Sequence, residues 1–402
     1  MGRDRSGGFF SRLLKRIRGL PDSQAQAASQ MDPITRYLLL SVAFALLIAA
    51  IAYWFYNRTH LFDTYEITAS TALEDVEGTQ YEQLSGRVIK YSHDGVFCVN
   101  TDNDMLWSSA YSMQTPVCHV SGSRMVIVEQ QGDQVVVLNA KGVLGSFTTP
   151  LPIMKARISS NGVVALVLKD KENVSWVNLY NAQGEELASV KASQAETGYP
   201  MDIALSDNGR QLLVSFLCNE GSELAGRVAL YDFSSLDSPD ESHLKGSVTY
   251  TDVVFPEVFF GSTGAPVAVA DDGFIVFSVG KSLKEKTRVQ LPEEIVSVFH
   301  DASNIGFVFR SVRTDAKYRM QVCSLNGRTA METEFDFSFS GIRMENGEIL
   351  VYDASTLQIY RTSGKPKLNV TYGKEVEYFT SLGKNRRYLV ITPKSIDRIR
   401  IS

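Results

Sequence analysis

Hydrophobic residues follow two different patterns along this chain, and the first is a single uncharged stretch. Residues 37–56, YLLLSVAFALLIAAIAYWFY, contain no Asp, Glu, Lys, Arg or His. A helix of about twenty residues is about 30 Å long, which matches the apolar layer of a bilayer, and it pairs its own backbone amides there. Aromatic residues at both ends, Tyr37 and the run 53–56, resemble the belts found at membrane surfaces. The pattern predicts a transmembrane helix over 37–56.

Two alternatives compete with a retained membrane anchor. A buried helix of a soluble core rarely runs this long without a charge. Ala50-Ile51-Ala52 has the small-x-small pattern at which a signal peptide is cleaved. Bulky aromatic residues continue the apolar run beyond it, so the pattern favours a retained signal-anchor.

Charges beside the stretch predict its orientation. Seven Lys or Arg and three Asp precede it, whereas acidic residues dominate the segment directly after it. The positive-inside rule then places the N-terminus in the cytoplasm and the C-terminal part outside the cell, in a single-pass protein of the cell membrane. We interpret 1–36 as a cytoplasmic basic head and 57–63 as a juxtamembrane linker. Within the head, 9–20 have the spacing of an amphipathic helix on an anionic membrane surface, and a disordered tail is the alternative.

From residue 64 to 402 the second pattern begins, in which short β-forming runs alternate with polar turns. Asn-Gly pairs, which favour hairpin turns, recur at 161–162, 208–209 and 346–347. Their spacing is close to one and then three units of forty-odd residues, and helical periodicity is absent. A tandem unit of that length with about four short strands is typical of a propeller blade. The sequence predicts an all-β extracytoplasmic domain over 64–402, a single β-propeller.

Counting the repeated phrases predicts the number of blades. The units begin near the following residues: Gly78, Pro116, Ile153, Met201, Asp252, Ile295 and Phe339, with a remainder from Val376. The remainder is too short for a blade, and residues 65–69 are predicted to supply its missing strand. This closure gives eight four-stranded blades, and seven is the alternative if the first and last units merge.

One unit carries a family resemblance. Residues 88–107, VIKYSHDGVFCVNTDNDMLW, have a strand, an Asp-Gly turn, a second strand, an Asp-bearing turn and a strand ending on Trp107. This order resembles the repeat of pyrroloquinoline-quinone-type propellers and WD-like repeats, although Asp104 stands where that pattern has Gly. The whole layout is similar to an uncharacterised family of membrane-anchored propellers of Gram-positive bacteria, known as a domain of unknown function. The resemblance implies an architecture and a location, but no activity.

Charge and cysteine content exclude some classes of protein. The part after residue 56 holds 33 Lys or Arg against 42 Asp or Glu, so it is not built to neutralise phosphates, and we expect no nucleic-acid partner. Four cysteines are far apart and lack the spacing of a zinc site: Cys98, Cys118, Cys218 and Cys323. An even count permits up to two disulfides, but buried free thiols are the favoured interpretation.

Candidate chemistry is sparse, and we assign no catalytic, cofactor-binding or metal-binding residue. Ser92-His93-Asp94 are adjacent on a turn, whereas a catalytic triad is assembled from distant segments. Asp102-Asn103-Asp104 lack the later Gly and Glu of a calcium loop, so a tight turn is favoured. No carboxylate or Cys lies at a spacing that would pair it with any of four histidines in a site: His60, His119, His243 and His300. Two Trp beyond the apolar stretch, Trp107 and Trp176, are too few for the quinone docking of the propeller dehydrogenases, so no cofactor is expected.

These observations predict a non-catalytic binding or scaffold module rather than an enzyme. Its partners would be the lipid bilayer, through one span, and a protein or cell-envelope ligand. The alternative is a propeller hydrolase acting on glycans, with carboxylates in the central channel. Two acidic side chains about 5–10 Å apart at the channel mouth, beside an Arg or aromatic wall, would favour that alternative.

Overall fold

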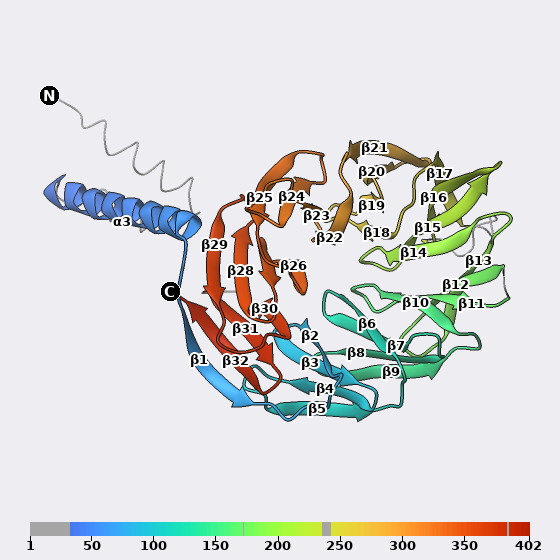
Figure 1. Ribbon diagram of the computed structural model, residues 1–402, viewed down its shortest axis with the longest axis horizontal. Coiled ribbons are helices and arrows are strands. Elements are labelled where there is room, and N and C mark those ends of the chain that lie inside the picture. The colour runs from blue at the N-terminus through green and yellow to red at the C-terminus, as the bar shows by residue number, and fades with distance from the viewer. Residues whose placement is uncertain (1–32, 172, 235–242, 384–385) are drawn as a thin grey trace. The chain divides into compact units, whose positions relative to one another are not determined.

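The chain forms two compact units, residues 1–60 and 61–402. The computed structural model describes residues 33–402 except 172, 235–242 and 384–385 (Figure 1). The predicted amphipathic helix at 9–20 lies outside the described residues.

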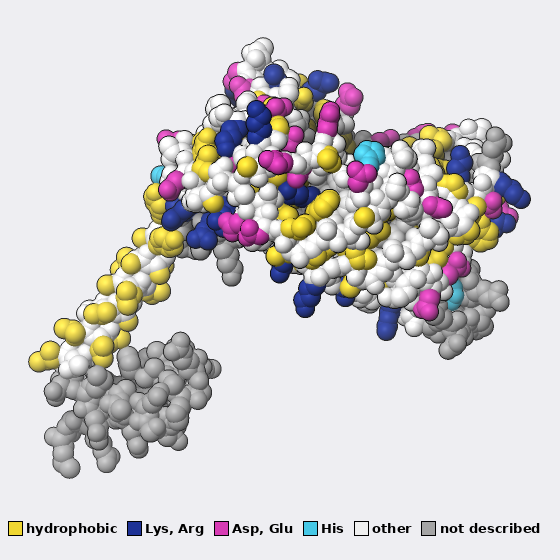
Figure 2. All heavy atoms as spheres, turned by 90° about the horizontal axis from the view of Figure 1, so that it is seen from below, with side chains coloured by type: hydrophobic (Ala, Val, Ile, Leu, Met, Phe, Trp, Pro, Cys, Tyr) yellow, Lys and Arg dark blue, Asp and Glu magenta, His cyan; other side chains and the backbone are white. Residues whose placement is uncertain are grey.

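The described part of the first unit is the helix α3 (Pro33–Thr59), 27 residues long. Apolar side chains predominate on the face of it that Figure 2 shows, and Leu38, Phe44 and Phe55 are more than half exposed. The prediction of a helix over 37–56 is confirmed, and the helix extends beyond both ends of that stretch. Within the described part of the chain, however, no helix has the length and apolar character needed to cross a membrane. The predicted membrane span is therefore not confirmed.

The second unit consists of eight antiparallel four-stranded sheets, arranged as the blades of one propeller (Figure 1). Blade 1 contains β2 (Gln80–Leu84), β3 (Arg87–Ser92), β4 (Gly95–Val99) and β5 (Met105–Ala110). Blade 2 contains β6 (Pro116–Ser121), β7 (Arg124–Glu129), β8 (Gln134–Asn139) and β9 (Gly142–Thr148). Blade 3 contains β10 (Ile153–Ile158), β11 (Val164–Lys169), β12 (Val174–Tyr180) and β13 (Glu186–Ser193). Blade 4 contains β14 (Tyr199–Leu205), β15 (Gln211–Glu220), β16 (Glu223–Asp232) and β17 (Leu244–Thr251).

The remaining blades follow in chain order. Blade 5 contains β18 (Glu257–Phe260), β19 (Pro266–Ala270), β20 (Gly273–Val279) and β21 (Leu283–Gln290). Blade 6 contains β22 (Ile295–His300), β23 (Asn304–Arg310), β24 (Tyr318–Ser324) and β25 (Thr329–Phe335). Blade 7 contains β26 (Gly341–Glu345), β27 (Glu348–Tyr352), β28 (Thr356–Arg361) and β29 (Pro366–Thr371). Blade 8 combines β30 (Tyr378–Ser381), β31 (Arg387–Thr392) and β32 (Ser395–Ile401) with the early strand β1 (Tyr65–Ala72).

The predicted closure and blade count are both confirmed. β1 pairs antiparallel with β32, from Tyr65 opposite Ile401 to Ala72 opposite Ser395. This pairing joins the first and last strands of the propeller in one blade, so hydrogen bonds between the two ends of the domain close the ring. The predicted starts of the eight units lie within five residues of the observed first strands.

Burial explains why these sequences form blades. Middle strands such as β7 and β11 are buried along nearly their whole length, because each blade packs between two neighbours. Outer strands such as β9 and β13 alternate between exposed and partly buried residues. The Asn-Gly turns also form as predicted, since Gly162 and Gly209 take the positive φ that such turns require.

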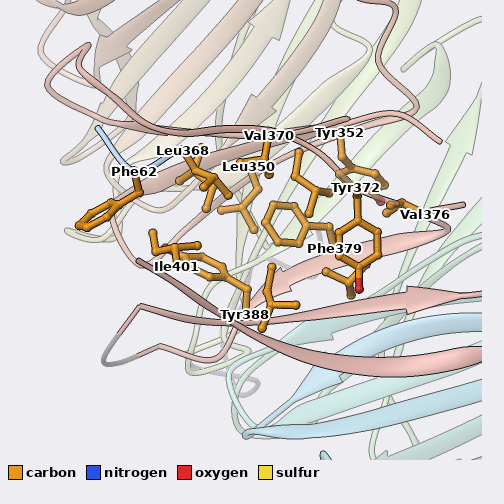
Figure 3. Packing of buried hydrophobic residues seen from close by; sticks show 14 residues of the cluster. Phe62, Leu350, Tyr352, Leu368, Val370, Tyr372, Val376, Phe379, Tyr388 and Ile401 are labelled. Carbon is orange, nitrogen blue, oxygen red and sulfur yellow. The ribbon is translucent and has the colours of Figure 1, made fainter. Parts of the chain in front are cut away.

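Hydrophobic clusters fill the space between adjacent blades. The largest one lies between blades 7 and 8 and includes Phe62, Leu368, Phe379 and Ile401. Figure 3 shows Phe62, Leu368 and Ile401 together at one end of this cluster, and Tyr372 with Phe379 toward the other. The segment before β1 is therefore part of the propeller core.

Candidate binding site in the central channel

The innermost strand of each blade lies nearest the axis of the ring, and we call the region around this axis the central channel (Figure 1). Because every blade repeats the same strand order, these inner strands run in the same direction and their C-terminal ends meet at one mouth of the channel. A hollow of about 390 Å³ lies at the ends of β6, β10, β14, β18 and β22. The side chains that line it and are discussed below are His119, Ser121, Arg157, Asp207, Glu257, Phe259, Phe260, His300 and Asp301. Five successive blades thus contribute to one site.

Asp202 on β14 holds one wall of the hollow together. Its carboxylate is fully buried, and Oδ1 accepts hydrogen bonds from Lys155 Nζ at 3.1 Å and Arg157 Nη2 at 2.8 Å. Its other oxygen, Oδ2, accepts the backbone N–H of Val258 at 2.9 Å. A buried charge is tolerated only when it is paired and hydrogen-bonded in this way. Asp202 therefore ties blades 3, 4 and 5 to one another.

A histidine–carboxylate pair forms the next part of the wall. His300 Nε2 lies 3.2 Å from Glu257 Oε1, and the His300 ring stacks on Phe259 with 3.8 Å between ring centroids. Burial opposes ionisation of Glu257, but the hydrogen bond with His300 and the nearby charges of His300, Arg157 and Lys155 outweigh it and lower the pKa of that carboxyl. Glu257 is thus held ionised beside an imidazole.

His119 supplies a neutral donor to the same hollow. Its Nδ1 accepts the backbone N–H of Ile158 at 3.1 Å, which requires this nitrogen to be unprotonated and leaves the hydrogen on Nε2. Burial and the positive charge of Arg157 lower the pKa of His119 to about 3. The ring therefore stays uncharged at neutral pH and presents one N–H.

A second polar network lies on the other side of the channel, where Arg343 stands between two carboxylates. Arg343 Nη2 is 2.9 Å from Glu82 Oε1, and Nη1 is 3.5 Å from Glu345 Oε1. The guanidinium also lies 4.5 Å from the centre of the Tyr378 ring. Burial disfavours its charge, but Tyr378, Glu82 and Glu345 more than offset this and raise the pKa of Arg343.

Both carboxylates of this second network have further partners. Glu345 Oε2 accepts hydrogen bonds from Thr380 Oγ1 at 2.8 Å and from the backbone N–H of Ser381 at 3.1 Å. Glu82 Oε2 accepts a longer hydrogen bond, of 3.4 Å, from the hydroxyl of Tyr378. The network links blades 1, 7 and 8, so it also holds the closing blade in place.

Turns at the channel mouth are joined from blade to blade. Ser121 Oγ is 3.1 Å from Ser160 Oγ, which donates to Asp207 Oδ1 at 3.2 Å. Asn161 donates its side-chain amide to the backbone carbonyl of Asn208 at 2.8 Å. The two Asn-Gly turns therefore do more than reverse the chain, because they align the rim of the hollow.

The structure does not assemble the side chains of Ser92, His93 and Asp94 into a catalytic triad. Ser92 Oγ accepts a long hydrogen bond from the Asp94 backbone N–H at 3.4 Å, and His93 Nδ1 lies 3.0 Å from the backbone oxygen of Met113. These are contacts of a hairpin turn, as the turn interpretation predicted.

Asp102 and Asp104 also belong to a tight turn. Asn100 Oδ1 accepts the backbone N–H groups of both residues at 2.9 Å, and Asp102 forms an ion pair of 2.7 Å with Arg398. Among the described residues, no group of three or more His, Cys, Asp or Glu is placed to hold a metal ion.

The four cysteines are free thiols, as the sequence favoured. Cys98, Cys218 and Cys323 are buried, and Cys118 is partly buried on an inner strand. Burial raises the pKa of Cys118 to about 12, although a hydrogen bond with Tyr91 acts in the opposite direction.

Sequence reasoning missed the residues that build the hollow. No spacing in the sequence links His119 or His300 to a partner, yet the ring brings both to one mouth of the channel and pairs His300 with Glu257. The predicted blade starts hold the signal that could have found them. Each residue lies three to five positions after a predicted start, in the C-terminal half of an inner strand: His119 after Pro116, Arg157 after Ile153 and His300 after Ile295.

Comparisons with known proteins agree with this fold. The crystal structure of BamB from Moraxella catarrhalis superposes with a TM-score of 0.51 at 14% identity, over 84% of this chain and 100% of that one. A eukaryotic initiation factor gives a TM-score of 0.52 at 12% identity, over 84% and 87% of the two chains. Apo AztD from Citrobacter koseri gives 0.50 at 12% identity, over 74% and 87%. The likeness to BamB supports the predicted pyrroloquinoline-quinone-like propeller at the level of fold.

Sequence comparison adds a family but no curated relative. No curated protein matches the chain. Residues 56–401 match the model of a family described as "Family of unknown function (DUF5711)".

Proposed function

The chain belongs to DUF5711, a family of unknown function, and we propose that this member is a non-catalytic binding or scaffold propeller. Its ligand is a protein or a cell-envelope polymer, and it binds at the hollow in the channel mouth.

One observation supports this proposal above the others. Polar side chains from five blades converge on a single hollow, and their mutual contacts hold them in place before any ligand arrives. Preorganised polar groups in a concave site are what specific recognition needs, because the ligand does not have to order them. His119 Nε2 and the exposed rim carboxylate of Asp207 are the groups best placed to meet a ligand.

Reversing the rim charge tests the proposal. We expect Asp207→Lys to reduce the yield of a crosslinked partner in pull-downs of the full chain from membranes by tenfold or more. Glu66→Lys, on the outer strand β1, is the matched control and is expected to retain the partner. Equal recovery of the same partner with both variants would show that the hollow is not the binding site.

The glycan hydrolase is the second candidate, and one observation favours it. Glu82 and Glu345 both form ion pairs with Arg343 on inner strands, so two carboxylates lie beside one arginine, which is part of what such an enzyme would need. Against it, both carboxylates already accept hydrogen bonds from protein groups. Release of soluble fragments from purified cell-envelope polymer by the wild-type chain, and its loss in Glu345→Gln, would favour the enzyme over the binding module.

We also propose a location at the cell membrane, with the N-terminus in the cytoplasm and the propeller outside. The uncharged stretch 37–56 and the basic residues before it support this location. The test is extraction of membranes with alkaline carbonate, followed by protease treatment of intact cells. Release of the chain by carbonate, or protection of the propeller from protease, would overturn the location.

A further inference from the structure

A second surface, separate from the channel, has the character of a docking site. A groove of about 350 Å³ lies beside blade 1, and we call it the seam groove. Its lining residues come from the connection between β1 and β2 and from β3, β4 and β5, and none lies on an innermost strand. Two contacts join blade 1 to the closing blade nearby. The side-chain amide of Asn103 donates a hydrogen bond to the backbone carbonyl of Ala72 at 3.1 Å, and Asp102 forms an ion pair of 2.7 Å with Arg398.

Three large apolar side chains line the seam groove and remain in contact with water. Val76 is 59% exposed, Phe97 is 41% exposed and Met105 is 65% exposed. Phe97 is the exposed residue of β4, whose other four residues are buried. Single exposed apolar residues are ordinary, but three that converge on one concavity mark an interaction surface.

The charges around the seam groove are acidic. Lys90 is the basic residue of its lining, but it is 5% exposed and forms an ion pair of 2.9 Å with Asp75. Asp75 also accepts a hydrogen bond from the hydroxyl of Tyr81 at 3.1 Å. Glu74 and Asp94 are exposed, and within the described part of the chain no ion pair within 4.0 Å engages either carboxylate. The groove therefore presents unneutralised negative charge beside apolar side chains.

Another carboxyl extends this acidic character. Burial raises the pKa of Glu377, and the negative charges of Glu375 and Asp75 act in the same direction. Like charges raise a carboxyl pKa only when they are near one another and weakly screened. Acidic groups thus gather where blades 1 and 8 meet.

We propose that the seam groove docks a segment of a partner protein in which one or two large apolar side chains are flanked by Lys or Arg. The apolar side chains would bury Val76, Phe97 and Met105, and the basic residues would pair with Glu74 and Asp94. The volume of the groove is at the lower end of the range of about 300–1,000 Å³ found for ligand pockets, which suits a short segment rather than a folded domain. This site goes beyond the channel hollow, because it uses different residues and a different kind of ligand.

Site-specific photocrosslinking in cells that make the full chain tests the proposal. A photoreactive amino acid replaces Met105, and the crosslinked peptide is sequenced by mass spectrometry. The matched control replaces Leu187, which is 41% exposed on the outer strand β13. We expect one partner segment at position 105 and not at 187, with a large apolar residue and Lys or Arg within a few positions of it.

Charge variants sharpen the test. Glu74→Lys and Asp94→Lys are expected to reduce the crosslink at position 105 by tenfold or more, whereas Asp207→Lys at the channel mouth leaves it unchanged. Four outcomes would overturn the proposal: no crosslink above that at position 187, crosslinks to lipid, crosslinks to a second copy of this chain, or a partner segment that lacks basic residues. Unchanged crosslinking in both acidic variants would overturn the role of charge.

Discussion

Phe62 provides the most direct test of how the ring is locked. Its side chain is 1% exposed and packs in the cluster between blades 7 and 8 (Figure 3). Its backbone N–H donates to the carbonyl of Lys367 at 2.8 Å, and the Arg386 guanidinium lies 4.4 Å from the centre of its ring. Phe62→Ala would leave a cavity where the segment before β1 meets blade 7.

The size of the effect follows from this burial. A buried aromatic side chain removes roughly 150–250 Å² from water, which at about 25 cal/mol per Å² amounts to ~4–6 kcal/mol. Alanine keeps part of that contribution, and the cavity adds a loss of packing, so the free energy of unfolding should fall by about 3–5 kcal/mol. Loss of the contact with Arg386 adds about 0.5–2 kcal/mol at most.

Urea denaturation of the detergent-solubilised full chain, followed by circular dichroism at a β-sheet wavelength, measures the change. The neighbouring Leu61 is 47% exposed, so Leu61→Ala is the matched control, expected to change the free energy of unfolding by less than about 0.5 kcal/mol. A loss below about 1 kcal/mol for Phe62→Ala, or equal losses for both variants, would refute the claim that this segment is part of the core.

Three further predictions concern the channel. Asp202→Ala should lower the free energy of unfolding by about 3–5 kcal/mol, because Lys155 and Arg157 lose a buried counter-ion. Asp207→Ala removes an exposed carboxylate and is the control in the same urea assay. A similar loss of stability in both variants would contradict the role of Asp202. Because the pKa of His119 falls from 6.5 to about 3 on folding, the unfolded chain binds a proton that the folded ring does not between these pH values. The stability contributed by neutral His119 is therefore present above about pH 6.5 and is lost as the pH falls toward 3. The urea midpoint of His119→Asn should accordingly decline less over that pH range than the midpoint of the wild type. Burial raises the pKa of the partly buried Cys118 thiol to about 12, so it should react with a thiol reagent at pH 8 much more slowly in the native chain than in urea, and equal labelling rates in the two states would contradict this.

Local pattern was enough to predict the propeller. Alternating short strands and Asn-Gly turns at a spacing of forty-odd residues specify one blade, because turn chemistry and strand length are properties of neighbouring residues. The closing strand was also visible, since the last unit lacked one strand and residues 65–69 had the composition to supply it. Both expectations agree with the pairing of β1 and β32.

Local sequence pattern did not predict the channel hollow, the Arg343 network or the seam groove. Glu257 and His300 are 43 residues apart, and Glu82 and Arg343 are 261 residues apart, so no spacing rule brings them together. The seam groove likewise combines residues from several strands, and nothing local marks Phe97 as the exposed position of β4. Membrane crossing by 37–56 was inferred from composition, and it stays a prediction.

Sequence alone thus determined the repeating unit and indicated how the ring closes, because strand length and turn chemistry depend on residues that are near in the chain and the missing strand follows from a count. It left eight and seven blades open, and the pairing of β1 with β32 decided for eight. Tertiary structure alone decided which polar residues share the channel mouth and which apolar residues remain exposed. The physical reason is that a closed ring sets the inner-strand ends of five blades around one hollow, and the charge and burial of each side chain there depend on neighbours supplied by other blades.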